Sequence, residues 1–505
     1  MTSDATTNRW RALAVCQVAL FATLIDVSVT NVALPSIGRA TDATPSQLQW
    51  IVTGYVLAFG LVPVLAGRLG DDRGRRSMFL IGVGGFVVAS AIVGISPDPK
   101  LIIVARVVQG LFGGLINPQV SGIVQQLFSG AERGRAFGAI GATVGTATAV
   151  GPLVGGLLIG IGGPDLGWRL VFFINVPIGL TAMVLAWRWL PARDVRRGPP
   201  PRLDVLGAAL LGLTTLCVLF PTVQYDSVRD ARLFWLLLPA VPLAAAFVRR
   251  EWRLTKARQD PLVDLRLFRR PSYTVGVGLA LLFFCGFTGL PLVLALYYQL
   301  GLGFTALQSG LGITAFAVGS ATAAPLAGRL VPRFGRPLVI VALGVFAAGA
   351  LAIDLVVRSA PVTTDPLEAA LRLSLPLLLL GIGAGAIITP NQALSLADVD
   401  PRMGGAAGGV LQTAQRIGSA VGQAVIGSAF FAALAAQGVS NATVGTTSGP
   451  TSVKVSQAYA SALSTSVLVT LLFIGAALVL GVVDLTLTRR RNRTPNAKDV
   501  PIASG

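Results

Sequence analysis

The chain has 505 residues, of which 53% are hydrophobic and only 12% are charged, whereas a soluble globular protein has about 25% charged residues. This composition argues against a water-soluble multidomain enzyme and predicts an all-α integral membrane protein. Histidine is absent, which excludes histidine catalysis, and the cysteines lie in apolar stretches without the spacing of metal ligands or of a disulfide framework. We therefore expect no metal and no cofactor.

Apolar runs that could cross a bilayer occur fourteen times along the chain. A transmembrane helix needs about 20 mostly apolar residues. The first run is too long for a signal peptide and lacks its cleavage site, so we expect a retained helix. The predicted spans are residues 11–35, 48–67, 78–96, 101–127, 135–161, 169–190, 204–223, 233–250, 272–298, 309–331, 337–357, 373–397, 405–435 and 461–487.

The net charge of +18 is explained by the loops between these spans. About three-quarters of the Lys and Arg residues fall in alternate loops if the N-terminus lies inside. Positive residues accumulate in cytoplasmic loops, so both termini are expected in the cytoplasm. The basic excess is then a topological signal, and no nucleic-acid partner is expected.

The first span contains the carboxylate Asp26, in the segment 24–35. An ionisable group within a span costs roughly 2.5–3.5 kcal/mol on insertion scales, so it persists where it is paired or functional. Arg106 lies in the fourth span at a similar depth, if each residue of a helix rises about 1.5 Å. The two side chains are expected to pair, in a site that suits the uptake and release of a proton.

A repeated motif follows the second and the tenth spans. GRLGDDRGRR at 67–76 reappears as GRLVPRFGRP at 328–337, and both copies are expected in short cytoplasmic turns, where glycines permit the reversal. Asp71 can meet a helix N-terminus, where anions are favoured. A weaker echo pairs Asn117-Pro118-Gln119 with Pro390-Asn391-Gln392. Repeated halves are typical of secondary transporters.

The repeat sets the expected organisation of the chain. Spans 1–6 correspond to spans 9–14, which leaves spans 7 and 8 as an inserted pair. The expected segments are an N-terminal six-helix bundle at 1–198, the inserted pair with a cytoplasmic connector at 199–271, a C-terminal six-helix bundle at 272–488 and a cytoplasmic tail at 489–505.

The fifth span is rich in small residues. Glycine permits close helix contact, and a proline removes a backbone hydrogen bond and permits bending. The residues concerned are Gly138, Gly151, Pro152, Gly155 and Gly156.

With these motifs the chain resembles the major facilitator superfamily, and within it the fourteen-helix drug:proton antiporters. Residues 67–76 match the loop signature, 24–35 the helix 1 signature, and Arg106 with Gln109 and Gly110 the helix 4 arginine motif. Residues 138–156 resemble the antiporter signature of exporters, with Ala147 at a position where glycine is usual. Trp168-Arg169 and 172–177 resemble the beginning of helix 6 in the same branch.

The resemblance implies a mechanism for these residues. Asp26 would carry the proton and Arg106 would tune its release. The loop with Gly67, Asp71, Gly74 and Arg75 would gate the two halves.

Substrate-binding candidates are the polar and aromatic residues within spans. Arg416 lies near the midplane, and an intramembrane charge is a functional candidate by default. No acid-rich pocket for dications is evident, so neutral or anionic amphiphiles are expected to be tolerated. The candidates are Asn31, Tyr55, Asn117, Gln119, Tyr297, Tyr298, Asn391, Gln392, Gln412, Gln415 and Arg416.

The predicted function is export of drugs or other small amphiphiles from a bacterial cytoplasmic membrane, by a monomer that works through alternating access and a proton gradient. The sequence has no GKS or GKT of a phosphate-binding loop, so no ATP is expected. Three alternatives remain: a dedicated exporter of one natural product or lipid, an uptake symporter, and a non-transporting membrane sensor or scaffold.

Overall fold

The computed structural model describes residues 3–191, 203–228, 231–257, 259–359, 365–439 and 453–493. These residues form sixteen α-helices and four short 3₁₀ or π segments, with no strand among them. The expected connector 199–271 and tail 489–505 therefore lie partly outside the described residues.

The α-helices follow the predicted apolar runs in order. In the first half they are α1 (Ser3–Thr41), α2 (Pro45–Leu61), α3 (Pro63–Arg73), α4 (Arg75–Ile95), α5 (Pro99–Leu127), α6 (Gly130–Phe173) and α7 (Asn175–Trp189). The pair that we expect to be inserted is α8 (Val205–Val228) and α9 (Leu237–Lys256). The second half has α10 (Pro271–Phe287), α11 (Gly289–Leu296), α12 (Ala306–Phe334), α13 (Arg336–Ser359), α14 (Pro366–Ser395), α15 (Gly404–Ala436) and α16 (Val453–Arg493).

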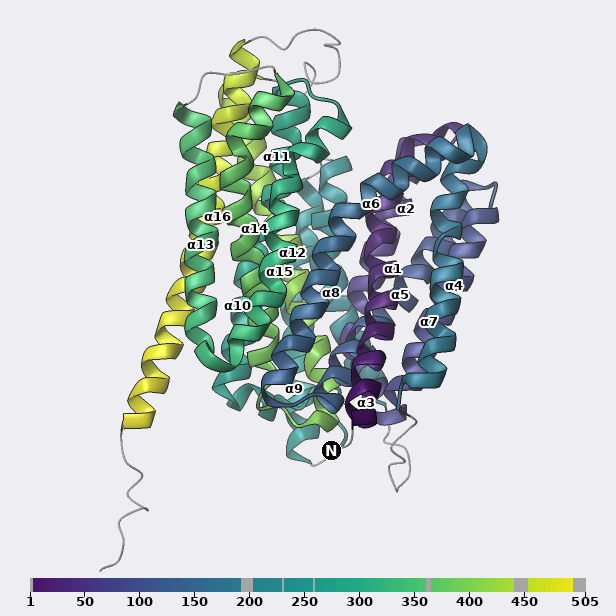
Figure 1. The fold of residues 1–505 in the computed structure, drawn as a ribbon, viewed down its shortest axis with the longest axis vertical. Helices are drawn as coiled ribbons and strands as arrows, with labels where there is room; N and C mark the ends of the chain where they lie inside the picture. Colours follow the sequence, from purple (N-terminus) through teal and green to yellow (C-terminus); the bar gives the residue numbers. More distant parts are fainter. Residues whose placement is uncertain are drawn as a thin grey trace, which may run out of the picture.

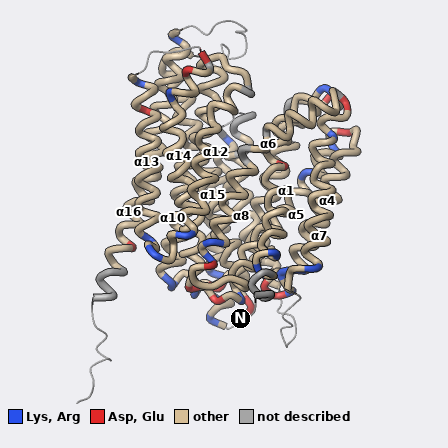
Figure 2. The backbone as a smooth tube through the Cα atoms, in the orientation of Figure 1, with Lys and Arg blue, Asp and Glu red and all other residues tan. Residues whose placement is uncertain are grey.

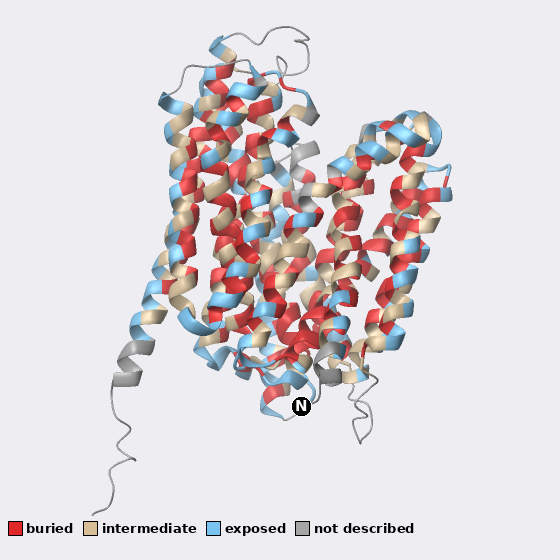
Figure 3. Ribbon diagram, viewed as in Figure 1, coloured by how far each residue is buried: buried red, intermediate tan, exposed pale blue. Residues whose placement is uncertain are grey.

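The helices gather into two bundles. Figure 1 shows α1 and α4–α7 on one side and α10–α16 on the other, with the bundles close together at the lower end and apart at the upper end. One large apolar core consists only of residues from the second half, between Leu279 and Ala477. Buried residues fill the lower end, where the bundles meet (Figure 3).

Twelve of the described helices are long and apolar enough to cross a membrane, or up to 13 with the bent pair α2–α3. All of the predicted runs lie on helices, and the fifth run, 135–161, lies within α6; among its described residues the apolar stretch is the shorter helix Leu153–Gly163. The fourteenth span therefore stays a prediction.

Two helix breaks place the functional motifs. Pro63 begins α3 after a 48° bend from α2. Within α6, Gly163 has φ 67° and ψ −166°, a conformation that glycine tolerates, and it separates the fifth predicted span from the sixth. At Pro35 the chain does not break, and α1 continues to Thr41.

The expectation that 67–76 forms a turn is wrong for most of the motif. Residues 67–73 belong to α3, and only Gly74, at φ 104°, reverses the chain before α4. The second copy behaves alike: residues 328–334 complete α12, and Gly335 turns at φ 56°. The other glycines of the motif are therefore helix-packing positions, because small residues let helices approach closely.

The segment after α9 packs on the first half. Leu262 and Val263 are buried in a cluster with Val64 of α3 and Phe247 of α9. Glu251 of α9 is also buried, and its Oε2 accepts a hydrogen bond from Val263 N at 2.8 Å. The inserted pair is thus held against α3, the helix that carries the loop motif.

Charge is distributed unequally between the two ends of the molecule. Figure 2 shows most Lys and Arg at the lower end of the molecule, near the start of the chain. This is the end at which the two bundles are in contact.

Candidate functional site

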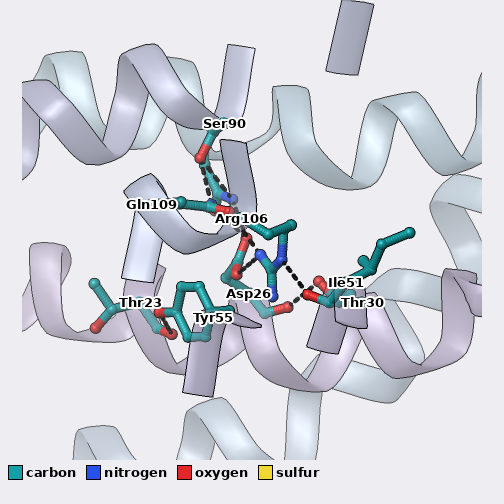
Figure 4. Close-up of polar contacts among 9 residues, drawn as sticks. Thr23, Asp26, Thr30, Ile51, Tyr55, Ser90, Arg106 and Gln109 are labelled. Carbon is teal, nitrogen blue, oxygen red and sulfur yellow. Dashed lines mark hydrogen bonds and ion pairs between the residues drawn. The ribbon is translucent and has the colours of Figure 1, made fainter. Parts of the chain in front are cut away.

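A buried polar cluster surrounds Asp26 of α1, which is 0% exposed. Its Oδ2 accepts a hydrogen bond from Arg106 Nη1 at 2.5 Å, and its Oδ1 accepts from Gln109 Nε2 at 3.0 Å and from Asn175 Nδ2 at 2.7 Å. A buried charge is costly unless it is paired and hydrogen-bonded. Both oxygens of Asp26 meet this condition (Figure 4).

Arg106 of α5 connects three helices. Its Nε donates to the Ile51 carbonyl of α2 at 3.1 Å, its Nη1 reaches Asp26 on α1, and its guanidinium carbon lies 4.3 Å from the centroid of the Tyr55 ring. The Tyr55 hydroxyl donates in turn to the Thr23 carbonyl at 3.2 Å. Arg106 therefore links α1, α2 and α5 through its contacts with Asp26, Ile51 and Tyr55.

Three further residues complete the cluster, and sequence reasoning assigned them no role in it. Gln109 lies three residues after Arg106 on the same face of α5, and its Nε2 also donates to Ser90 Oγ of α4 at 2.7 Å. Asn175 lies at the start of α7. The available signal was a polar side chain inside an apolar run, which in a membrane helix calls for a partner.

A second cluster lies where the two halves meet. Asp71, near the end of α3, accepts hydrogen bonds from the backbone N–H groups of Gly405 at 3.0 Å and Ala406 at 2.8 Å, in the first turn of α15. The N-terminus of a helix favours an anion. Arg75 Nη2 donates to Asp71 Oδ1 at 2.6 Å and also to the Pro401 carbonyl, so the ion pair extends across the interface.

Glycines make this interface close. A Cβ on Gly67 would lie 2.1 Å from the Gly405 carbonyl oxygen, and a Cβ on Gly409 would lie 2.4 Å from the Pro63 carbonyl oxygen. No real Cβ tolerates such distances. The backbones of α3 and α15 are therefore in direct contact, and Gly67 serves this contact rather than a turn.

Side-chain hydrogen bonds join the halves at the same end. Ser121 Oγ of α5 accepts from Gln392 Nε2 of α14 at 3.2 Å and from Gln412 Nε2 of α15 at 3.3 Å. Gln125 donates to the Leu396 carbonyl at 2.8 Å. The two bundles are thus held closed at the end that carries the loop motif.

The glycines of α6 contact two different helices. Gly138 packs against the α12 backbone at Ala324 and Pro325, whereas Gly151 and Gly155 pack against Ser28 and Val29 of α1. A Cβ on Gly156 would meet nothing within 4 Å. The side chain of Pro152 lies outside the described part of the structure. The helix thus contacts α12 at one end and, at the other, the segment of α1 next to Asp26.

The substrate-binding candidates do not form one site. Asn391 is held by Arg336 and by the Gly276 carbonyl, and Gln119 donates to the Ala66 carbonyl at 2.8 Å, so both have structural contacts. Tyr297 and Tyr298 lie in the core of the second half. Asn31 is exposed, and Asn117 and Gln415 are intermediate.

Four of the candidates lie at the interface between the halves, and one of them, Gln392, donates to Ser121 Oγ at 3.2 Å. Tyr55 lies beside Arg106, Gln412 contacts Ser121, and the Arg416 guanidinium carbon lies 4.7 Å from the centroid of the Phe59 ring of α2.

Comparison with known proteins decides the family. The model of the Major Facilitator Superfamily matches residues 18–423. The chain belongs to the major facilitator superfamily. This confirms the resemblance drawn from the motifs, and it makes the chain a multi-pass membrane transporter and not an enzyme.

Several relatives of this superfamily member are antibiotic exporters or resistance proteins. The probable actinorhodin transporter of Streptomyces coelicolor is 37% identical over 85% of this chain and 74% of its own length. The puromycin resistance protein of Streptomyces alboniger is 35% identical over 85% and 83%. The tetracenomycin C resistance and export protein of Streptomyces glaucescens is 31% identical over 83% and 75%.

Solved structures agree on the fold. The human organic anion transporter MFSD10 matches with a TM-score of 0.62 at 18% identity, over 92% of this chain and 99% of its own. The proton:xylose symporter XylE matches with a TM-score of 0.59 at 14% identity, over 92% and 95%.

Proposed function

We propose that this transporter is a proton-coupled antiporter that exports drugs or other small amphiphilic compounds across the bacterial cytoplasmic membrane by alternating access. The observation that carries the proposal is the buried cluster of Asp26, Arg106, Gln109 and Asn175. Asp26 is a carboxylate within a span, and both of its oxygens accept hydrogen bonds from the other three residues. Ionisable groups at such positions mark proton and substrate pathways.

The proton would act through the ion pair. Protonation of Asp26 removes the charge that compensates Arg106, and a buried guanidinium without a counter-ion is strongly disfavoured. Arg106 also binds the Ile51 carbonyl and lies on the Tyr55 ring. When Arg106 moves away from the protonated Asp26, α5 shifts against α1 and α2. In this way one proton would change the arrangement of the N-terminal bundle.

The gate would be the contact between α3 and α15. Asp71, Arg75 and the glycine pair Gly67 and Gly405 close the lower end of the molecule, and Gly74 sets the turn that follows. Most Lys and Arg residues lie at this end, which supports its placement in the cytoplasm. We infer a state closed to the cytoplasm, with both termini inside and fourteen spans in a monomer.

A dedicated exporter of one natural product is the second candidate. It is favoured by the relatives, two of which are named for actinorhodin and tetracenomycin C. An uptake symporter is less well supported, because α6 carries the glycine pattern of exporters, and a non-transporting sensor would have no use for the Asp26 cluster.

Transport into inside-out vesicles tests the proposal. We expect a proton gradient to drive uptake of actinorhodin by the wild-type protein, and Asp26→Asn to abolish the gradient-driven part while the protein still folds. The matched control is Asp354→Asn, a carboxylate in α13 that pairs with Arg358 at 2.9 Å near the helix end. Gradient-driven uptake by Asp26→Asn at the wild-type rate would disprove the assignment.

A further inference from the structure

Arg416 differs from the other arginines buried within the bundles. Arg106 pairs with Asp26 at 2.5 Å and Arg336 pairs with Asp484 at 3.2 Å. Arg416 makes no ion pair within the described part of the chain. A cation that is held among apolar helices without a counter-ion is disfavoured, so its presence calls for an anion that the protein itself does not supply.

The neighbours of Arg416 are aromatic. Its guanidinium lies over Phe59, whose ring is stacked on Tyr55 with centroids 5.8 Å apart and an interplanar angle of 27°. Arg106 lies over the Tyr55 ring. The side chains of Arg106, Tyr55, Phe59 and Arg416 thus form a column, with an aromatic pair of α2 between two cations. The column runs from the Asp26 cluster in the first half to α15 in the second.

In this column the guanidinium of Arg416 remains able to bind an anion. A guanidinium above a ring has its N–H groups along the edge of its plane, where they can bind a carboxylate with two parallel hydrogen bonds. The nearest carboxylate in the column, Asp26, has both oxygens engaged by Arg106, Gln109 and Asn175. It cannot serve Arg416 without dismantling its own cluster.

Arg416 also lies on the seam between the halves, which continues beyond it where Ala420 packs on Leu57 and Leu219. Earlier along α15, Gly405 and Gly409 touch α3 and Gln412 contacts Ser121. One turn further, Arg416 contacts Phe59 and is partly exposed, whereas Phe59 itself is buried. A ligand bound between the two bundles at this level would meet the Arg416 side chain.

We propose that Arg416, with Phe59 and Tyr55 beside it, binds the anionic group of a hydrophobic organic anion, and that such anions are the preferred substrates. The inference rests on the proposed export function and adds the charge of the cargo. Guanidinium N–H groups bind a carboxylate, phenolate or sulfonate, and the rings and small residues around it accept an apolar body. A hydrophobic cation is repelled at the same place.

Two dyes with the same fused-ring core and opposite charge test the inference. Purified wild-type protein is titrated with fluorescein, in its anionic form, and with cationic rhodamine 6G, and binding is followed by fluorescence polarisation. We expect fluorescein to bind more tightly. Arg416→Gln should weaken the binding of fluorescein about tenfold, equivalent to about 1.4 kcal/mol. Its affinity for rhodamine 6G should stay unchanged or increase.

Further variants keep the test decisive. Arg416→Lys retains the charge but lacks the flat donor fork, so its affinity for fluorescein should fall between wild type and Arg416→Gln. Arg358→Gln, in which the arginine paired with Asp354 is lost, should bind fluorescein as the wild type does. The inference would be overturned if the wild type bound rhodamine 6G more tightly than fluorescein or did not bind fluorescein at all. It would also be overturned if Arg416→Gln bound fluorescein as tightly as the wild type does.

The outcomes separate this inference from the proposed function. If fluorescein binding depends on Arg416 but no compound is transported by a proton gradient, proton antiport is wrong and the anion site stands. If gradient-driven export requires Asp26 but Arg416→Gln does not alter dye selectivity, the antiport proposal stands and the anion site is wrong.

Discussion

At the scale of single residues, the Asp26 cluster shows why one carboxylate needs several helices. Three N–H donors come from α5 and α7, and the acceptor comes from α1. Ser90 of α4 takes a further hydrogen bond from Gln109. Because each donor also fixes a helix, the cluster is both the candidate proton site and a structural centre of the first bundle.

Asn175 gives a prediction about this centre. Asn175→Ala removes one of the three donors to a buried carboxylate, and a hydrogen bond to a charged group contributes about 1.5–3 kcal/mol. We expect a lower thermal unfolding midpoint for the purified protein and slower gradient-driven transport. Asn31→Ala, on an exposed position of α1, is the control and should leave both unchanged; equal effects of the two substitutions would contradict the role of Asn175.

At the scale of helices, a glycine that belongs to a family signature does not always lie at a close helix–helix contact. Gly67 and Gly156 both belong to segments that match family signatures, yet their surroundings are opposite. A Cβ at Gly67 would overlap the backbone of α15, whereas one at Gly156 would meet nothing within 4 Å. The consequence of adding one methyl group therefore depends on the interface and not on the signature.

The corresponding prediction compares two alanine variants. Gly67→Ala should prevent the close approach of α3 and α15, so transport should fall by an order of magnitude or more while the separate bundles stay folded. Gly156→Ala should transport at a rate near that of the wild type, because a helix interior also favours Ala over Gly by about 1 kcal/mol. Transport assays in vesicles measure this, and a severe loss of transport in Gly156→Ala would contradict the prediction.

At the scale of the whole molecule, the two halves meet at one end and separate at the other, as alternating access requires (Figure 1). Each elementary charge that crosses the membrane potential contributes about 2.3 kcal/mol per 100 mV. Entry of a proton and exit of an anion would both be driven by a potential that is negative inside. The proposed cargo charge is therefore compatible with the proposed coupling.

A crosslink across the interface tests whether the halves must part. Ser121 Oγ and Gln412 Nε2 are 3.3 Å apart in the closed arrangement. With the native cysteines replaced, Ser121→Cys combined with Gln412→Cys should react with a short, reducible bifunctional thiol reagent, and transport should stop until a reductant is added. Either single cysteine variant should keep its activity under the same treatment. Full transport by the crosslinked protein would show that this interface does not open.

The sequence alone determined the all-α membrane class, the positions of the helices and the family, because hydrophobic length and charge placement are local properties. It also paired Asp26 with Arg106, since helix rise converts residue number into depth. The tertiary structure decided the rest. Gln109, Asn175 and Ser90 entered the cluster, Gly67 moved from a turn to an interface, and Arg416 proved to be without an ion pair in the described residues. These depend on which faces of distant helices meet, and side-chain contact across helices is not encoded in the periodicity of any single one.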